Sequence, residues 1–201
     1  MHAPRKFKKA FMAQLLKSLR AAGQVSKSMG LRERRDAVRL SSDVAMALAS
    51  AQGRAAPRSA TWARALVARY AAERRNEALM LRIMGGADYE TAAVDAAAAA
   101  VARSRKEARS RRIVRRSRCV CSTGRKRRSL LTASGGGGCG AMAAARRMVR
   151  ARLQVLRSLV PGGEALRGFS LLSETLDYVV CLKTQVELMQ CLCKGSHSQL
   201  G

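Results

Sequence analysis

The sequence predicts an all-α protein built from two different kinds of segment. Apolar residues recur at helical spacing in several stretches before residue 102, and many of them are alanine. Nearer the C-terminus, two further helical patterns flank Pro161, Gly162 and Gly163. Proline cannot donate the next backbone hydrogen bond and glycine accepts a left-handed turn, so this sequence ends a helix. We therefore expect an alanine-rich helical region at 1–102, a basic segment and Gly-rich linker at 103–140, a pair of helices at 141–193 and a disordered tail at 194–201.

Charge separates the two kinds of segment. The chain has 201 residues, with 39 Lys or Arg against 13 Asp or Glu and a formal net charge of +26. Residues 1–134 contain 31 of the basic and 9 of the acidic side chains, whereas residues 135–201 contain 8 and 4. This balance predicts the nucleus, nucleic acid or an anionic surface as the environment of the protein.

The apolar content predicts neither a large core nor a membrane span. Only seven residues are aromatic, and alanine buries little area, so we expect no large single core. No run of 18 apolar residues occurs. The six cysteines form no regular framework and are expected to be reduced thiols. A zinc site at Cys191, Cys193 and His197 is disfavoured, because C-x-C is not the usual ligand spacing.

The first predicted helix covers residues 5–23. It places Phe7, Phe11, Met12, Leu15, Leu16 and Leu19 on one face, with Lys and Arg opposite. We expect this face to pack on a partner or on a neighbouring helix of the same chain. Because no acidic residue precedes Glu33, the segment also fits an organellar transit peptide.

Two more helices are predicted before the basic segment. One covers residues 31–51 and includes Val44 and Met46. The next is expected to run as a single helix from a cap at Ser59 or Thr61 to a stop at Gly85 and Gly86. Its Trp62, the only tryptophan, is expected to be a packing anchor.

Residues 103–128 hold 13 Lys or Arg and a single acid, Glu107. Such a run fits a solvated disordered segment, a nuclear-import signal or a phosphate-binding patch. We favour import, with non-specific nucleic-acid contact as an accompanying property, and the lack of aromatic residues argues against base stacking. The expected import residues are Arg109, Arg111, Arg112, Arg115, Arg116, Arg118, Arg125, Lys126, Arg127 and Arg128.

The two C-terminal patterns form apolar seams suited to pairing with another helix. Two helices joined by one short loop cannot bury both seams alone, so dimerisation into a four-helix bundle is expected. An intramolecular hairpin that packs on the N-terminal helices is the alternative. The expected interface consists of Val149, Leu153, Leu156, Leu159, Val160, Leu172, Leu176, Val179, Leu182, Val186 and Met189.

These two segments resemble the helices of plant basic helix-loop-helix proteins. The resemblance lies in Leu156, the run 159–162, Leu172, Glu174, the pair 178–179, Leu182 and the run 185–187, about a quarter of the chain. The DNA-reading arm departs from the family, because Gly138 and Met142 stand where a histidine and a glutamate would read bases. Phe169 also stands where a phosphate-contacting lysine often begins the second helix.

The residues of the arm support the same conclusion. Residues 133–145 carry no charge, so they cannot neutralise phosphates or offer paired donors to guanine. The chain thus resembles the atypical, non-DNA-binding branch that binds increased-leaf-inclination-type helix-loop-helix proteins. That resemblance implies restraint of cell elongation in brassinosteroid-linked growth control, through heterodimers that block DNA-binding relatives.

The sequence as a whole predicts a nuclear transcriptional regulator with other helix-loop-helix proteins as partners and no cofactor. A homodimer is the second possibility for pairing. An enzyme is disfavoured, because the only histidines, His2 and His197, lie near the termini and no nucleophile motif or phosphate loop occurs. One rival is a DNA-binding transcription factor that uses residues 103–128. The other is a nucleic-acid-packaging protein, which fits the charge and leaves the C-terminal seams unexplained.

Overall fold

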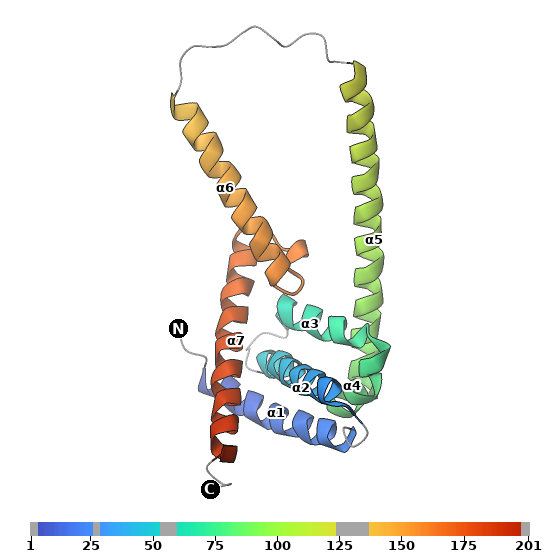
Figure 1. Cartoon of the computed structure of the whole chain (residues 1–201), viewed down its shortest axis with the longest axis vertical. Coiled ribbons are helices and arrows are strands. Elements are labelled where there is room, and N and C mark those ends of the chain that lie inside the picture. The colour runs from blue at the N-terminus through green and yellow to red at the C-terminus, as the bar shows by residue number, and fades with distance from the viewer. Residues whose placement is uncertain (1–3, 26–28, 53–59, 124–136, 198–201) are drawn as a thin grey trace. The chain divides into compact units, whose positions relative to one another are not determined.

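The computed structural model describes residues 4–25, 29–52, 60–123 and 137–197 (Figure 1). The regular elements of these residues are the helices α1 (Arg5–Val25), α2 (Leu31–Gln52), α3 (Thr61–Ala71), α4 (Glu77–Met84), α5 (Gly86–Thr123), α6 (Gly137–Leu159) and α7 (Gly168–His197), with two short 3-10 turns, η2 (Arg74–Asn76) and η3 (Gly163–Ala165). The predicted all-α class is confirmed.

The chain forms two compact units. Unit 1 contains residues 1–96 and 155–201, and unit 2 contains residues 97–154. Unit 1 therefore holds α1 to α4, the start of α5, the end of α6 and all of α7. This division cuts across the expected helical pair at 141–193, because α7 groups with the N-terminal helices and most of α6 does not.

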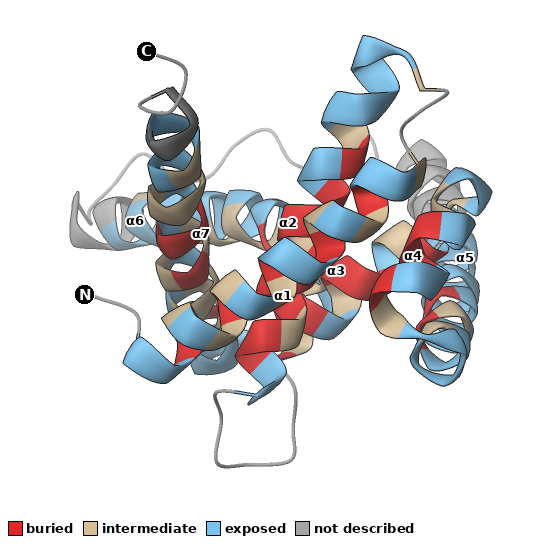
Figure 2. Ribbon diagram, turned by 90° about the horizontal axis from the view of Figure 1, so that it is seen from below, coloured by how far each residue is buried: buried red, intermediate tan, exposed pale blue. Residues whose placement is uncertain are grey.

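The core of unit 1 forms where α1, α2, α3 and α4 meet (Figure 2). Phe7, Phe11 and Leu15 are buried on α1, at a spacing of one helical turn, so the expectation that this face packs on a neighbouring helix of the same chain is confirmed. The rings of Phe7 and Phe11 stack with their centroids 6.0 Å apart.

Helix α2 lies at the centre of unit 1 and packs against α1, α3 and α7. Between Leu40 and Ser50 its residues are buried on nearly all sides, and many of them are Ala or Ser. Small side chains let helix axes approach closely, as at Ser41, whose hydroxyl donates to the carbonyl oxygen of Ser18 at 3.4 Å. The expectation of no large core was wrong, because bulky side chains such as Trp62, Phe11 and Leu66 join the alanines in one buried cluster.

The single helix expected between Thr61 and Gly85 is divided into α3 and α4. The side-chain amide of Asn76 donates to the carbonyl oxygen of Tyr70 and to a carboxylate oxygen of Glu73, both at 3.2 Å. These bonds satisfy groups at the end of α3 and favour a turn over a continued helix. Ala60 immediately precedes α3 and occupies its N-cap position, so the capping role expected of Thr61 was wrong. Ser59 lies outside the described residues.

The turn between α6 and α7 has the predicted left-handed glycine. Gly162 has a φ of 72°, and a Cβ atom built there would lie 2.8 Å from the Cβ of Ala65 on α3. Val160, just before it, is buried in the core of unit 1. The turn is therefore fixed both by its backbone conformation and by close packing on α3.

Helices extend further than the sequence predicts in three places. Helix α5 keeps residues 103–123 helical, where a partly disordered region is expected, and residues 124–136 lie outside the described residues. Helix α6 begins at Gly137, inside the expected linker. Helix α7 continues to His197, inside the expected tail. None of the described helices is both long and apolar enough to cross a lipid bilayer.

Candidate protein-interaction site

Helix α7 presents two different faces. Leu171, Cys181, Thr184 and Gln185 are buried on the face that packs on α2 and α3. On the opposite face lies an apolar row that we call the open stripe, in which Leu172 is 43%, Leu176 53%, Val179 52% and Val186 55% exposed. The spacing of these four residues is that of a helix that pairs with another helix.

A carboxylate of α7 caps the start of α3. The backbone N–H of Trp62 donates to Oε2 of Glu174 at 3.2 Å. Ala60, at the N-cap position of α3, has no side chain that could accept this bond. Glu174 thus satisfies one of the open N–H groups of α3 and places a negative charge at the positive end of that helix.

The indole ring of Trp62 anchors the next turn of α7. Its Nε1–H donates to Oδ2 of Asp177 at 2.7 Å, and its ring lies 5.0 Å from that of Tyr178, tilted by 45°. Trp62 is completely buried, so its predicted role as a packing anchor is confirmed. Burial also raises the pKa of the Tyr178 hydroxyl, with the nearby Asp43 as the second cause.

Further along α7, at Gln185, a polar network holds this helix to α2. The amide of Gln185 donates to the hydroxyl of Ser42 at 2.5 Å and to Oδ1 of Asp43 at 2.7 Å. The other oxygen of Asp43 accepts a 2.6 Å hydrogen bond from the Tyr70 hydroxyl. Burial and the Asp43 carboxylate raise the pKa of Tyr70 to about 12. Networks of this kind fix the orientation of a helix because each missing partner would leave a buried polar group unpaired.

The third acidic residue of α7 also faces the N-terminal helices. Glu187 lies 3.9 Å from Nζ of Lys8 on α1, in an exposed ion pair of small energetic value. Thus Glu174, Asp177 and Glu187 all contact residues of α1 or α3. Sequence reasoning missed these partners, because acidic residues on a helix ordinarily face solvent.

The residues of the predicted interface fall into three groups. Val160 is 4% exposed and is buried in the core of unit 1. Leu182 and Met189 are partly buried against the core of unit 1, and Leu153 and Leu156 are partly buried on α6. Six residues remain exposed: Val149, Leu159, Leu172, Leu176, Val179 and Val186.

A hollow borders the C-terminal end of the open stripe. It lies at the junction of α2 and α7 and is lined by residues that include Arg39, Gln185, Val186 and Met189. Its floor is mainly apolar side-chain surface. The stripe is therefore continuous with a recess that could accept a side chain of a partner.

Helix α6 is basic and partly apolar. Its exposed apolar residues include Met148, Val149 and Val155. Arg146 and Arg147 are its first charged residues, and everything from Gly137 to Ala145 is uncharged. The helix thus includes residues 137–140, which belong to the expected Gly-rich linker.

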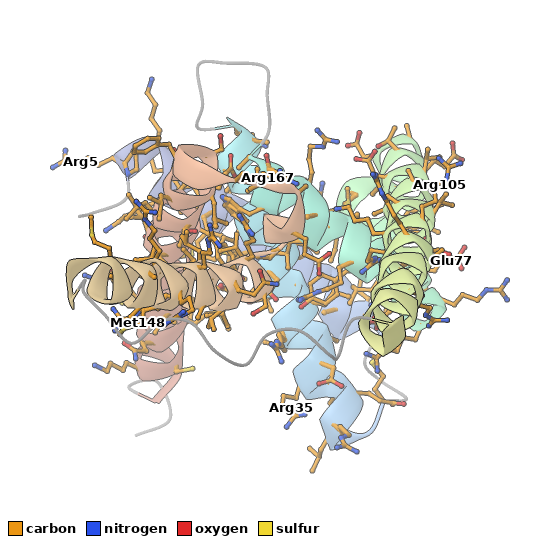
Figure 3. All side chains as sticks on the ribbon, turned by 90° about the horizontal axis from the view of Figure 1, so that it is seen from above. Arg5, Arg35, Glu77, Arg105, Met148 and Arg167 are labelled. Atoms are coloured by element: carbon orange, nitrogen blue, oxygen red, sulfur yellow. The ribbon has the colours of Figure 1, made fainter. Side chains whose placement is uncertain are left out.

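The basic part of α5 exposes its side chains as far as they are described. Arg103, Arg105, Lys106, Arg109 and Arg111 are all exposed. Figure 3 labels Arg105 on this helix. Of the other expected import residues, Arg112, Arg115, Arg116 and Arg118 belong to α5 without described side chains, and residues 125–128 lie outside the described residues. Across the described parts of both units, no three His, Cys, Asp or Glu side chains cluster as a metal site would require.

Comparison with known proteins places the helices that hold α7 in a recognised domain. The model of the IBH1-like N-terminal domain matches residues 4–73, the region that contains Lys8, Ser42, Asp43, Trp62 and Tyr70. The chain is 35% identical to "Transcription factor IBH1-like 1" of Arabidopsis thaliana over 169 residues, which cover 84% of this chain and 81% of that protein. A 39-residue stretch, 19% of each chain, is 54% identical to "Transcription factor IBH1" of Oryza sativa subsp. japonica. No solved structure matches the chain.

Proposed function

This chain belongs to the family of IBH1-like transcription factors, and from that premise we propose that it represses transcription by pairing with DNA-binding helix-loop-helix proteins. The pairing partner would lie on the open stripe of α7. The resulting heterodimer would hold a single DNA-reading arm, contributed by the partner.

One observation carries the proposal. The open stripe stays exposed although the opposite face of α7 is fully engaged by α2 and α3. Four large aliphatic residues along one face of a helix form an exposed apolar patch. Such patches on protein surfaces mark interaction sites. Burying the exposed half of one such side chain against a partner would contribute about 1 kcal/mol to the free energy of binding.

The engaged face of α7 also supports a particular form of pairing. Glu174, Asp177 and Gln185 anchor α7 from the side away from the stripe. A partner could therefore approach the stripe without displacing the N-terminal helices. Pairing would add a further neighbour to α7 and would not exchange one neighbour for another.

Repression follows from the chemistry of the missing arm. A DNA half-site needs its own basic helix, and residues 133–145 of this chain supply no charge. A mixed dimer would lose about half of the specific base contacts and half of the phosphate neutralisation. Its affinity for a two-half-site element would fall steeply, and the partner would be held away from its target.

The cellular setting belongs to the same proposal. The basic residues at 109–118 and 125–128 would act as the nuclear-import signal. The resemblance of the C-terminal segments to the atypical plant branch supports a place in brassinosteroid-linked control of cell elongation.

The decisive experiment changes the stripe. Leu176→Asp or Val179→Asp would bury an unpaired charge in the interface, which costs about 2 kcal/mol or more, so partner binding should weaken at least about thirtyfold. Binding is measured by pull-down and titration against a panel of DNA-binding helix-loop-helix proteins. The matched control is Ser173→Asp, an exposed site on the same helix outside the stripe.

Circular dichroism of each variant shows whether the helices are retained. Unchanged binding by folded Leu176→Asp and Val179→Asp variants would rule out the stripe as the pairing surface. Loss of binding by the Ser173→Asp control would show that any charge on α7 disrupts the complex, and would equally count against the assignment.

A further inference from the structure

The acidic residues of α7 are turned toward the chain itself. Glu174 and Asp177 accept hydrogen bonds from Trp62, and Glu187 faces Lys8. These are all the acidic residues of α7. Glu174 and Asp177 lie on the face opposite the open stripe, and Glu187, which follows Val186, already faces Lys8. Lys183 is exposed between Val179 and Val186, so the stripe has an exposed base among its members.

Helix α6, considered alone, also has more basic than acidic residues. It contains five arginines and no acidic residue. Arg146 and Arg152 each lie three residues from Val149, and Arg150 lies three residues from Leu153, so the arginines flank the apolar seam on the helix surface. Arg146, Arg147, Arg150 and Arg152 are exposed. Glu164, in the turn η3, is the one other acid between residues 137 and 197.

This distribution distinguishes between two kinds of partner. A second copy of the chain would bring arginines against arginines along α6 and Lys183 against an equally basic stripe. Like charges across a helix interface disfavour a pair, and complementary charges select the partner. A helix pair with Asp or Glu beside its own seam would gain from each of these positions.

We infer that α6 and α7, each by its own charge pattern, favour a helix-loop-helix partner with acidic residues beside its apolar seam and disfavour a second copy of this chain. The inference rests on the pairing function proposed above. Lys8 of α1 contributes to it by facing Glu187, the acid that follows Val186.

The chain itself supplies the first test, which needs no identified partner. The full-length variant Arg146→Glu, Arg150→Glu, Arg152→Glu carries a complementary surface for the wild-type chain. Wild type alone and the variant alone are expected to stay monomeric by sedimentation, whereas an equal mixture forms a dimer with at least roughly tenfold tighter association, about 1.4 kcal/mol. Adding Leu176→Asp to both chains should abolish that dimer.

A neutral variant controls for the loss of the arginines. Gln at positions 146, 150 and 152 should give self-association between that of wild type and that of the mixture. The mixed dimer should also weaken as salt is raised, because screening shortens the range of charge interactions to about 8 Å at physiological ionic strength. Circular dichroism confirms that each variant keeps its helices.

A second test uses a defined probe. The dimerisation domain of a DNA-binding helix-loop-helix protein is prepared in two forms, with Glu or with Gln at the positions that flank its seam. The full chain should bind the Glu form at least roughly tenfold more tightly at low salt, and the difference should close at high salt.

The outcomes separate the two proposals. Equal binding of both probe forms, with binding still lost in Leu176→Asp, would overturn the charge inference and leave the pairing function standing. A wild-type chain that dimerises as strongly as the mixture would also overturn it. Absence of binding by both probe forms and by the mixture would count against the pairing function as well.

Discussion

Trp62 is the residue on which the attachment of α7 depends most. Its backbone and its indole each donate to a different carboxylate of α7, and its ring contacts Tyr178. A single buried residue thus joins α3 to Glu174 and Asp177 of α7 through its backbone and its side chain. Its sequence neighbours are ordinary helix formers, so this role follows from position and from the indole N–H.

Replacing Trp62 by Phe should destabilise unit 1. The change removes the hydrogen bond to Asp177 and part of the ring contact, and a bond to a charged group contributes about 1.5 to 3 kcal/mol. Urea denaturation followed by circular dichroism measures the loss. Phe169→Leu is the aromatic control: Phe169 is 90% exposed on the same α7 helix, so its replacement should change stability by less than about 0.5 kcal/mol.

Ionisation of Tyr70 is expected to make the stability of the folded protein fall at alkaline pH. Its pKa is raised from 10.0 to about 12 by burial and by Asp43, so the folded state favours the neutral hydroxyl more than the unfolded chain does. This stabilisation is fully present below pH 10 and is lost as the pH rises from 10 toward 12. Because Tyr70 is only partly buried, solvent screening reduces the effect, and we expect the contribution to be about 1 kcal/mol.

The measurement is the urea midpoint of wild type and Tyr70→Phe on both sides of that window. Wild type should lose more stability than the variant between pH 10 and 12. Parallel losses in the two proteins would show that the Tyr70–Asp43 bond does not set the alkaline response, and that another group does.

Helix α7 illustrates how one element serves two surfaces. Its buried residues and its open stripe each recur at helical spacing on opposite sides, so the helix is apolar on two faces. The sequence pattern predicted an apolar seam on this helix, and four residues of that seam form the open stripe. It did not reveal that the polar residues Glu174, Asp177 and Gln185 belong to a second contact, because their partners lie more than 100 residues away.

The turn before α7 tests whether the placement of this helix depends on backbone geometry. Gly162→Ala would force a side chain into a left-handed conformation and against Ala65, with an expected loss of about 2 to 4 kcal/mol. Thermal unfolding measures it. Gly86→Ala is the control, since that glycine has open space around it and no positive φ; its replacement should be neutral or slightly stabilising. Equal stability of the two variants would show that the turn tolerates a Cβ atom.

At the scale of the whole molecule, the net positive charge is distributed unevenly along the chain. The excess of basic residues is concentrated before residue 135, and the DNA-reading position after it is empty of charge. The charged segment can therefore serve transport or general affinity for nucleic acid without reading sequence. In the proposed function, pairing belongs to the C-terminal helices.

This division predicts the behaviour of the nuclear-import signal. With Arg125, Lys126, Arg127 and Arg128 changed to Ala, a fluorescent fusion large enough to require active import should shift from nucleus to cytoplasm. The readout is the ratio of nuclear to cytoplasmic fluorescence. The matched control removes four exposed charges from α1: Lys6, Lys9, Lys17 and Arg20.

Nuclear retention of the first variant would refute a signal at 125–128. Changing residues 109–118 in the same fusion would then show whether the signal lies in α5. A shift caused by the α1 control would mean that total charge, or the amphipathic N-terminal helix, directs transport.

The sequence by itself determined the all-α class, the stop at Gly162, the seam on α7 and the loss of charge in the DNA-reading arm, since each of these depends on neighbours along the chain. Tertiary structure decided the rest. It divided the predicted helix 61–84 through Asn76, placed Val160 in the core and turned the acids of α7 toward Trp62 and Lys8. Side-chain pairing across many residues in sequence depends on how helices pack, and local pattern carries no information about which of two apolar faces the chain will cover itself.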